Sequence, residues 1–213
     1  MTYTMKKIFV LAAMTVAFLI TGCSGKAQEA APSALDVIMT RTSIRSFTGD
    51  PVSKEQLETI LKAGMAAPTA MNGQPWRFVV VTDKDRMASV FGSGPRSEMF
   101  TTAGAVIVVC GQTTSKGRPF GQPDGPEQEM PNMFWFEDCS AAAENILLAV
   151  KALGLGAVWT AGYPAEDRVA PIAAALGLPD NVKPLCIIPV GVPAEDPAPK
   201  DKWNPDNIHW EKW

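Results

Sequence analysis

The sequence contains a single histidine, His209, and only four cysteines, none of which forms a C-x-x-C pair. One histidine cannot by itself support a zinc site or a Ser-His-Asp triad, so neither kind of active site is expected. Basic residues are also few: 19 lysines and arginines stand against 22 acidic residues, and the formal net charge is −3. Nucleic-acid binding depends on clustered lysine and arginine, so this balance argues against a nucleic-acid partner.

Beyond the first thirty positions the sequence has no run of 18 uncharged apolar residues, so its body is not expected to span a membrane. The 213 residues, 46% of them apolar and 19% charged, suit one ordinary globular domain. Three cysteines lie in this part, Cys110, Cys139 and Cys186, and the first and last of them stand inside apolar runs. We interpret all three as small buried side chains rather than as disulfides or metal ligands.

The first residues have the pattern of an export signal. Lys6 and Lys7 precede an apolar run over residues 8–20, and the small residues that follow lead to Cys23. The L-I-T-G-C ending resembles the bacterial lipobox, which implies that Cys23 is acylated and becomes the first residue of the mature protein. The alternatives are an uncleaved anchor helix and a secretory signal in which Cys23 has no role.

From this pattern we predict three parts of the chain. Residues 1–22 are a lipoprotein signal peptide, residues 23–33 are a flexible tether, and residues 34–213 are the folded domain. A chain acylated in this way is held at the membrane by its lipid anchor only. The expected location is the cell envelope of a bacterium, with the domain facing the periplasm or the outside.

Apolar periodicity and turn residues predict helices that alternate with strands. Ser53 and Gln56 form a capping-box pattern, and the apolar residues after them, which include Met65, recur at helical spacing. Strands separated by helices predict a mixed sheet that is covered by helices. The expected helices are 33–40, 54–66, 84–91, 136–153 and 166–176, and the expected strands are 77–81, 105–110, 157–160 and 185–190.

Two segments lack a periodic pattern. Residues 111–132 are rich in glycine, proline and polar residues, and we expect a long loop, which inside a compact domain is usually functional or disordered. The tail from Pro193 contains four prolines but also Trp203, Trp210 and Trp213. Because a tryptophan stabilises a structure mainly when it is buried, the tail should pack either on its own domain or on a partner subunit.

The segment from Arg41 to Phe47 has the composition of an anion site. If it is extended, Arg41, Ser43 and Arg45 point the same way, because side chains alternate along a strand. Two guanidinium groups and a hydroxyl on one side suit a phosphate, to which arginine forms paired hydrogen bonds. The alternative is a solvated surface with no ligand.

The loop at residues 67–76 joins a predicted helix to a predicted strand. Asn72 and Gln74 each carry one acceptor and two donors, which suits the polar edge of a heterocycle, and a stiff connector is the alternative role. Further along, Gly154 and Gly156 follow a helix and lack a third glycine at the required spacing. A dinucleotide-binding fingerprint is therefore not expected there.

Four segments in this order resemble the nitroreductase family of FMN enzymes, and the resemblance covers residues 35–213. They read R-x-S-x-R-x-F, A-A-P-T-A-M-N-G-Q-P-W-R-F, A-A-A-E-N-x-L-L-A-x-x-x-L-G-L-G and I-H-W-E-K-W. The resemblance implies an α+β fold with a mixed sheet covered by helices, and FMN at the interface of a homodimer. It also implies that a C-terminal arm from about residue 193 wraps around the other subunit.

The resemblance also implies roles for single residues. Arg41 would bind the FMN phosphate with help from Ser43, and Arg45 would lie beside the pyrimidine side of the flavin. The loop would cover the flavin from the partner subunit, the strand end would lie beside the ring, and a lysine of the arm would complete the phosphate site. The implied cofactor-binding residues are Arg41, Thr42, Ser43, Arg45, Pro68, Thr69, Ala70, Asn72, Ala161, Gly162, Lys200 and Lys202.

For activity, the resemblance implies an FMN-dependent oxidoreductase that takes hydride from NAD(P)H or another small reductant. The acceptors would be nitroaromatic, quinone-like or similar molecules, reduced in a ping-pong mechanism. Flavin N5 carries the hydride, so no side chain is expected to act as nucleophile or base, and Arg45 would support the reduced flavin electrostatically. Residues 111–132, with Phe134, Trp135 and Phe136, are hypothesised to shape the substrate channel.

Two alternative functions remain open from the sequence. One is a different flavin reaction within the family, such as dehalogenation or dehydrogenation. The other is a non-enzymatic lipoprotein that binds flavin or a protein partner. Separately, Ala161 stands where some members have an acidic residue by the flavin, a departure that bears on the flavin's electronics or on the reach of the substrate.

Overall fold

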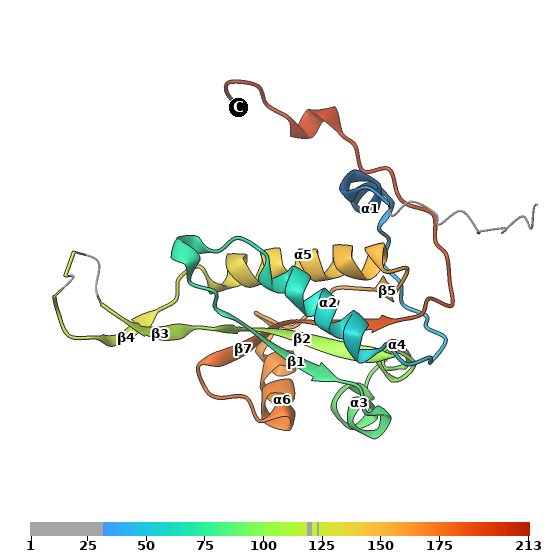
Figure 1. Ribbon diagram of the computed structural model, residues 1–213, viewed down its shortest axis with the longest axis horizontal. Helices are drawn as coiled ribbons and strands as arrows, with labels where there is room; N and C mark the ends of the chain where they lie inside the picture. The colour runs from blue at the N-terminus through green and yellow to red at the C-terminus, as the bar shows by residue number, and fades with distance from the viewer. Residues whose placement is uncertain (1–31, 119–120, 123) are drawn as a thin grey trace, which may run out of the picture. The chain divides into compact units, whose positions relative to one another are not determined.

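The two most continuous apolar runs of the sequence form the centre of a sheet in the computed structural model (Figure 1). Strands β2 (Ala105–Gln112) and β7 (Val182–Gly191) pair in antiparallel register, with Ile107 opposite Ile188. Both are buried along nearly their whole length, because helices cover both faces of the sheet and the side chains on both faces are apolar. β-branched residues of this kind favour the pleated, buried conformation.

The structure describes residues 32–118, 121–122 and 124–213. The predicted signal peptide, Cys23 and most of the tether lie outside these ranges. Over the part that is described, no helix combines the length and the apolar character that a membrane span requires.

The helices and strands are distributed along the whole domain. The helices are α1 (Ala34–Thr40), α2 (Lys54–Met65), α3 (Lys84–Phe91), α4 (Glu98–Thr101), α5 (Trp135–Ala152) and α6 (Glu166–Leu176), with 3-10 helices η1 (Ala70–Asn72) and η2 (Pro205–Asn207). The remaining strands are β1 (Trp76–Val81), β3 (Thr114–Gly117), β4 (Gln128–Pro131), β5 (Gly156–Ala157) and β6 (Thr160–Ala161).

The main sheet has the order β1-β2-β7-β5, and β6 pairs with another part of β7. Helices α2 and α5 cover one face, and α3 and α6 cover the other (Figure 1). The predicted α+β class, a sheet covered by helices, is confirmed. Every strand pair among the described residues is antiparallel, however, so the parallel pairs expected of a mixed sheet are not found there.

Helix α5 packs closely against α2 as well as against the sheet. A Cβ built on Gly64 of α2 would lie 2.9 Å from Cγ1 of Ile146, so only glycine fits at this contact. The amide of Asn145 donates to the carbonyl of Ala63 at 3.0 Å and joins the same two helices. The predicted capping box of α2 is present, but Met65, expected on its apolar stripe, is exposed.

Two segment predictions were wrong. Residues 111–132 are not one long loop, because β2 extends to Gln112 and strands β3 and β4 pair as an antiparallel hairpin. The side chains of β3 and β4 are mostly polar and exposed, so these strands lack the apolar alternation that would have predicted them. The strand expected at 157–160 is divided into β5 and β6 on either side of Val158 and Trp159.

The segment that follows α1 runs beside the start of the C-terminal tail. The backbone N–H of Ile44 donates to the carbonyl of Ala157 at 3.0 Å, and that of Ala194 donates to the carbonyl of Ser46 at 2.9 Å. Ile44 is buried and lies against Gly156, where a built Cβ would come within 2.8 Å of the side chain. The residues 41–46 are therefore fixed by the sheet edge and not left on a mobile loop.

The tail itself is almost entirely exposed. Trp203 is 72% exposed, Trp210 80% and Trp213 98%. The alternative that these tryptophans pack on their own domain is therefore wrong. That they pack on a partner subunit stays a prediction.

Gly156→Ala tests the close contact that fixes this segment. The added methyl group would overlap Ile44, and overpacking of this kind lowers the free energy of unfolding by about 1–3 kcal/mol. Urea unfolding at an unchanged m-value measures the loss. Gly117→Ala is the matched control, because its Cβ would meet nothing nearer than 3.9 Å, and an equal change in both variants would contradict the close contact.

Candidate functional site

Arg41 lies directly after α1 and is held by helix α5. Its Nε atom is 3.5 Å from a carboxylate oxygen of Glu144, and the arginine side chain is the less exposed of the two. An ion pair through Nε leaves the two terminal nitrogens of the guanidinium for another anion. In the described part of the chain Arg41 forms no second ion pair.

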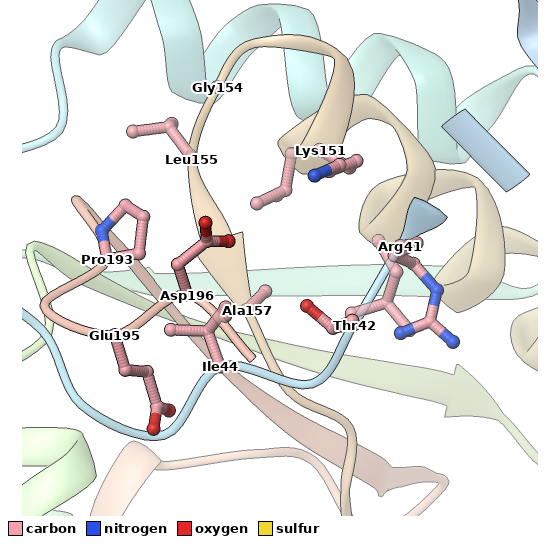
Figure 2. Close-up of a pocket in the computed structure, with 12 residues that line it drawn as sticks. Arg41, Thr42, Ile44, Lys151, Gly154, Leu155, Ala157, Pro193, Glu195 and Asp196 are labelled. Carbon is pink, nitrogen blue, oxygen red and sulfur yellow. The ribbon is translucent and has the colours of Figure 1, made fainter. Parts of the chain in front are cut away.

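A pocket of about 80 Å³ lies beside Arg41 (Figure 2). Arg41 and Thr42 are on one side of it, and Pro193 and Glu195 are on the other. A water molecule takes about 30 Å³, and pockets for small ligands usually hold about 300 Å³ or more, so this one admits a phosphate-sized group but no flavin ring. The full lining is Arg41, Thr42, Ile44, Leu147, Val150, Lys151, Gly154, Leu155, Ala157, Pro193, Glu195 and Asp196.

Glu195 fixes the backbone beside the second arginine. One of its carboxylate oxygens accepts the N–H groups of Arg45 at 2.5 Å and of Ser46 at 3.1 Å. The Nη1 atom of Arg45 in turn donates to the carbonyl of Ser43 at 3.5 Å. Glu195 thus fixes the backbone of the segment that carries the predicted FMN-binding residues Arg41, Ser43 and Arg45, whose roles stay predictions.

The loop between α2 and β1 has a strained backbone. Met71, Asn72 and Gln74 have φ values of 50°, 56° and 46°. Asparagine adopts this conformation comparatively readily, whereas at Met71 and Gln74 it costs about 1–3 kcal/mol each. The amide of Gln74 donates to the side-chain oxygen of Asn72 at 2.8 Å, so these two predicted heterocycle-binding amides pair with each other in one protomer. Strain that is kept in a short, ordered loop is typical of a ligand-binding site.

The loop is tied to α5 by a residue that the sequence did not reveal as part of a site. The Oδ1 atom of Asp138 accepts the N–H of Ala70 at 2.9 Å. Asp138, Glu144 and Glu195 were all missed, because each acts on a residue far away in the sequence and no local pattern marks it.

Near the strand end, Ala161 is exposed and Gly162 is buried. A Cβ on Gly162 would lie 3.0 Å from the carbonyl oxygen of Pro184, so the neighbouring strand leaves little room for a side chain here, whether or not a ligand approaches. Tyr163, next in the chain, packs edge-on against Trp135 with ring centroids 4.9 Å apart. The strand end therefore meets the first turn of α5.

The aromatic trio at the start of α5 is divided between core and surface. Trp135 is buried, whereas Phe134 and Phe136 are exposed, so only these two are available to line a substrate channel. The hypothesis that this region shapes the channel stays a prediction. Lys200 and Lys202 are exposed and take part in none of the ion pairs among the described residues.

The three cysteines of the domain are free and buried, as predicted. Burial raises the pKa of Cys110 and of Cys139 to about 12 and also raises the pKa of Cys186. A thiol is reactive as the thiolate, so these groups are unreactive near neutral pH. No cluster of metal-ligating side chains occurs within the residues described.

A model of the nitroreductase family matches residues 38–94 and 87–192 of the chain. The chain belongs to the nitroreductase family. A protein of Methanothermobacter thermautotrophicus described as a NADH dehydrogenase/NAD(P)H nitroreductase is 40% identical over 179 residues, which cover 84% of this chain and 87% of that protein.

Solved structures agree with this assignment. A crystal structure from Bacteroides thetaiotaomicron, described by the same two activities, is 40% identical and has a TM-score of 0.74 over 85% of this chain and 99% of that one. An FMN-dependent nitroreductase of Clostridium difficile is 25% identical, with a TM-score of 0.69 over 84% of this chain and 99% of that one. The fold and the oxidoreductase class are confirmed, and FMN is confirmed at the level of the family.

Proposed function

We propose that this chain is an FMN-dependent NAD(P)H oxidoreductase that reduces nitroaromatic, quinone-like or similar acceptors by a ping-pong mechanism. The observation that carries the proposal is the strained loop with Met71, Asn72 and Gln74 at positive φ, which is ordered and tied to α5. A free loop would relax such strain, so a ligand-binding role is its simplest explanation.

The residues fit the acidic end of FMN. Arg41 keeps its terminal nitrogens for a phosphate while Glu144 holds Nε, and the hydroxyl-bearing Thr42 lines the same small pocket. Ser43 and Arg45 follow on the same fixed segment. Lys151, Glu195 and Asp196 also line the pocket, and a lysine of the arm, Lys200 or Lys202, would add positive charge at the phosphate.

We further propose that the site is completed in a homodimer. The pocket beside Arg41 is too small for the flavin ring, and the apolar side chains of α1 are left on the surface, with Leu35 72% and Met39 74% exposed. A second copy would cover these side chains and the tryptophans of the tail. Its loop, with Pro68, Thr69, Ala70 and Asn72, would then lie over the flavin bound by the first copy.

In this arrangement FMN supplies the two-electron transfer, and the chain supplies binding and electrostatics. Arg45, whose backbone is held by Glu195, would bring a positive charge that favours negative charge on the ligand beside it. Ala161 is exposed at the strand end and has only a small side chain, which leaves room for a flat molecule beside it, whereas Gly162 is packed against Pro184. The buried thiols take no part, because their raised pKa values keep them protonated.

We also propose that the chain is a lipoprotein anchored through Cys23 at a bacterial membrane, with the domain outside the cytoplasm. The support is the sequence pattern alone: two lysines, an apolar run and the L-I-T-G-C ending. NAD(P)H is expected to be scarce in that compartment. Small electron donors other than nicotinamides should therefore be tested together with NAD(P)H.

The redox proposal predicts two half-reactions of the full chain loaded with FMN in detergent. Under anaerobic conditions, NADH or NADPH should bleach the flavin absorption, and a nitroarene or a quinone added later should restore it. Chemical reduction with dithionite is the positive control, because it shows whether the bound flavin can be reduced at all. Bound FMN that dithionite bleaches but no nicotinamide or other small donor reduces would contradict the enzyme and favour a flavin-binding protein.

Arg41→Ala is expected to weaken FMN binding about ten- to a hundredfold, because a charged hydrogen bond to phosphate contributes about 1.5–3 kcal/mol. Titration of the apoprotein, followed by flavin fluorescence, measures the change. Arg168→Ala is the matched control, because Arg168 is exposed on α6, on the other face of the sheet. Light scattering should find both variants dimeric, and unchanged FMN affinity in Arg41→Ala would refute the assignment.

Cys23→Ala is expected to abolish acylation and to leave an unprocessed precursor that still carries residues 1–22. Membrane fractionation and the intact mass of the purified chain measure this, because the acylated form is heavier than the trimmed polypeptide. Ser24→Ala should remain acylated. A wild-type chain without acyl mass would disprove the lipid anchor and leave the redox proposal untouched.

A further inference from the structure

Asp138 is the one charged side chain that is buried among the residues the structure describes, with 5% of its surface exposed. It lies in the first turn of α5. Its Oδ1 atom accepts the N–H of Ala70, while its Oδ2 atom is buried and has no hydrogen-bond partner in the described structure. A buried carboxylate that is only half satisfied is costly, so its presence calls for a specific reason.

The start of α5 lowers part of this cost. The first turn of a helix carries partial positive charge from its unpaired N–H groups, which favours a carboxylate there by about 0.3–1 kcal/mol. This contribution is smaller than the penalty for burying a charged group without a full set of partners. Stability of α5 alone therefore does not account for Asp138.

The loop that Asp138 contacts has little else to hold it. Between residues 68 and 73, the other backbone hydrogen bonds stay inside the loop: Asn72 donates to Thr69 at 3.3 Å and Gly73 donates to Ala70 at 2.9 Å. Among the described residues, the bond from Ala70 to Asp138 is the only hydrogen bond that joins this stretch to another element. It lies directly before the positive-φ residues Met71 and Asn72.

We propose that Asp138 is the positioning residue of the flavin-covering loop. By accepting the N–H of Ala70 it anchors the strained turn to α5, and so sets where Asn72 lies relative to the flavin bound by the partner subunit. The acceptor oxygen, and not the negative charge, performs this role. The inference rests on the proposed function for its effect on flavin, whereas the anchoring itself does not depend on a cofactor.

The anchoring is tested first without flavin, by hydrogen–deuterium exchange of residues 68–74 in the full chain. Asp138→Ala should speed exchange at the Ala70 amide about tenfold or more, because a buried acceptor is lost. Asp138→Asn keeps an oxygen at this position and should restore protection. Glu137→Ala, which removes an exposed carboxylate one residue earlier in the same turn, is the matched control and should change nothing.

A second variant keeps the test valid if Asp138→Ala does not fold. Ala70→Pro removes the donor instead of the acceptor, and Thr69 before it already has an extended backbone, with φ −138° and ψ 151°, which a following proline requires. Ala70→Pro alone should speed exchange of residues 71–74 about tenfold or more relative to the wild type, because the same hydrogen bond to Asp138 is lost. Exchange of residues 71–74 at the wild-type rate in Ala70→Pro would overturn the proposal.

The consequence for flavin is read from binding and from spectra. Asp138→Ala should raise the dissociation constant for FMN about tenfold and alter the visible circular dichroism of the bound flavin, and Asp138→Asn should resemble the wild type in both. Equal exchange in wild type and Asp138→Ala, or an Asp138→Asn variant as defective as Asp138→Ala, overturns the proposal. If the wild-type chain binds no FMN, the proposed function is contradicted. The anchoring of the loop by Asp138 is then still tested by the hydrogen–deuterium exchange rate of the Ala70 amide.

Discussion

The burial of α5 between the sheet and α2 is the constraint on which the rest of the site depends. The helix is fixed in register by the contact of Ile146 with Gly64, where no side chain would fit. From this one helix, Glu144 reaches Arg41, and Asp138 reaches Ala70. A shift of α5 by one residue would rotate these side chains by about 100°, so the two halves of the site are positioned by the same core packing.

The electrostatics around Arg41 are balanced rather than simply positive. Glu144 contacts Arg41, Glu195 binds the backbone at Arg45, and Asp196 lines the same pocket. These carboxylates lower the positive potential, but Glu144 also orients the guanidinium group of Arg41, and Glu195 fixes the backbone from which Arg45 extends. Because an arginine that is already oriented loses less conformational entropy on binding, affinity for an anion here comes from geometry more than from net charge.

Local patterns in the sequence predicted the parts of the fold that local interactions determine. The capping box at Ser53 set the start of α2, and Gly177, with φ of 67°, ends α6 where that helix was expected to end. The pair of strands β3 and β4 was missed because these strands are held by backbone pairing and carry mostly polar side chains without apolar alternation.

The candidate site was predicted only in part for a similar reason. Residues 41–45 and the loop at 67–76 were recognised from their own composition, and family resemblance assigned their roles. Asp138 was not recognised, because its partner, Ala70, is 68 positions away and a single aspartate in the first turn of a helix is ordinarily a surface residue. Long-range hydrogen bonds leave no periodic pattern in the sequence, so candidate ligand-binding residues can be predicted from the sequence more readily than the residues that position them.

The exposed apolar residues connect assembly to cofactor binding. Trp203, Trp210 and Trp213 lie on the surface of one protomer together with the outer side of α1. A buried tryptophan removes about 150–250 Å² from water, and each Å² of apolar surface contributes about 25 cal/mol, so covering these side chains would strongly favour a second copy. If the same association places one protomer's loop over the other's flavin, FMN binds the dimer and not the monomer. Any ligand that prefers the assembled state stabilises it by mass action, so cofactor loading and dimer formation would strengthen each other.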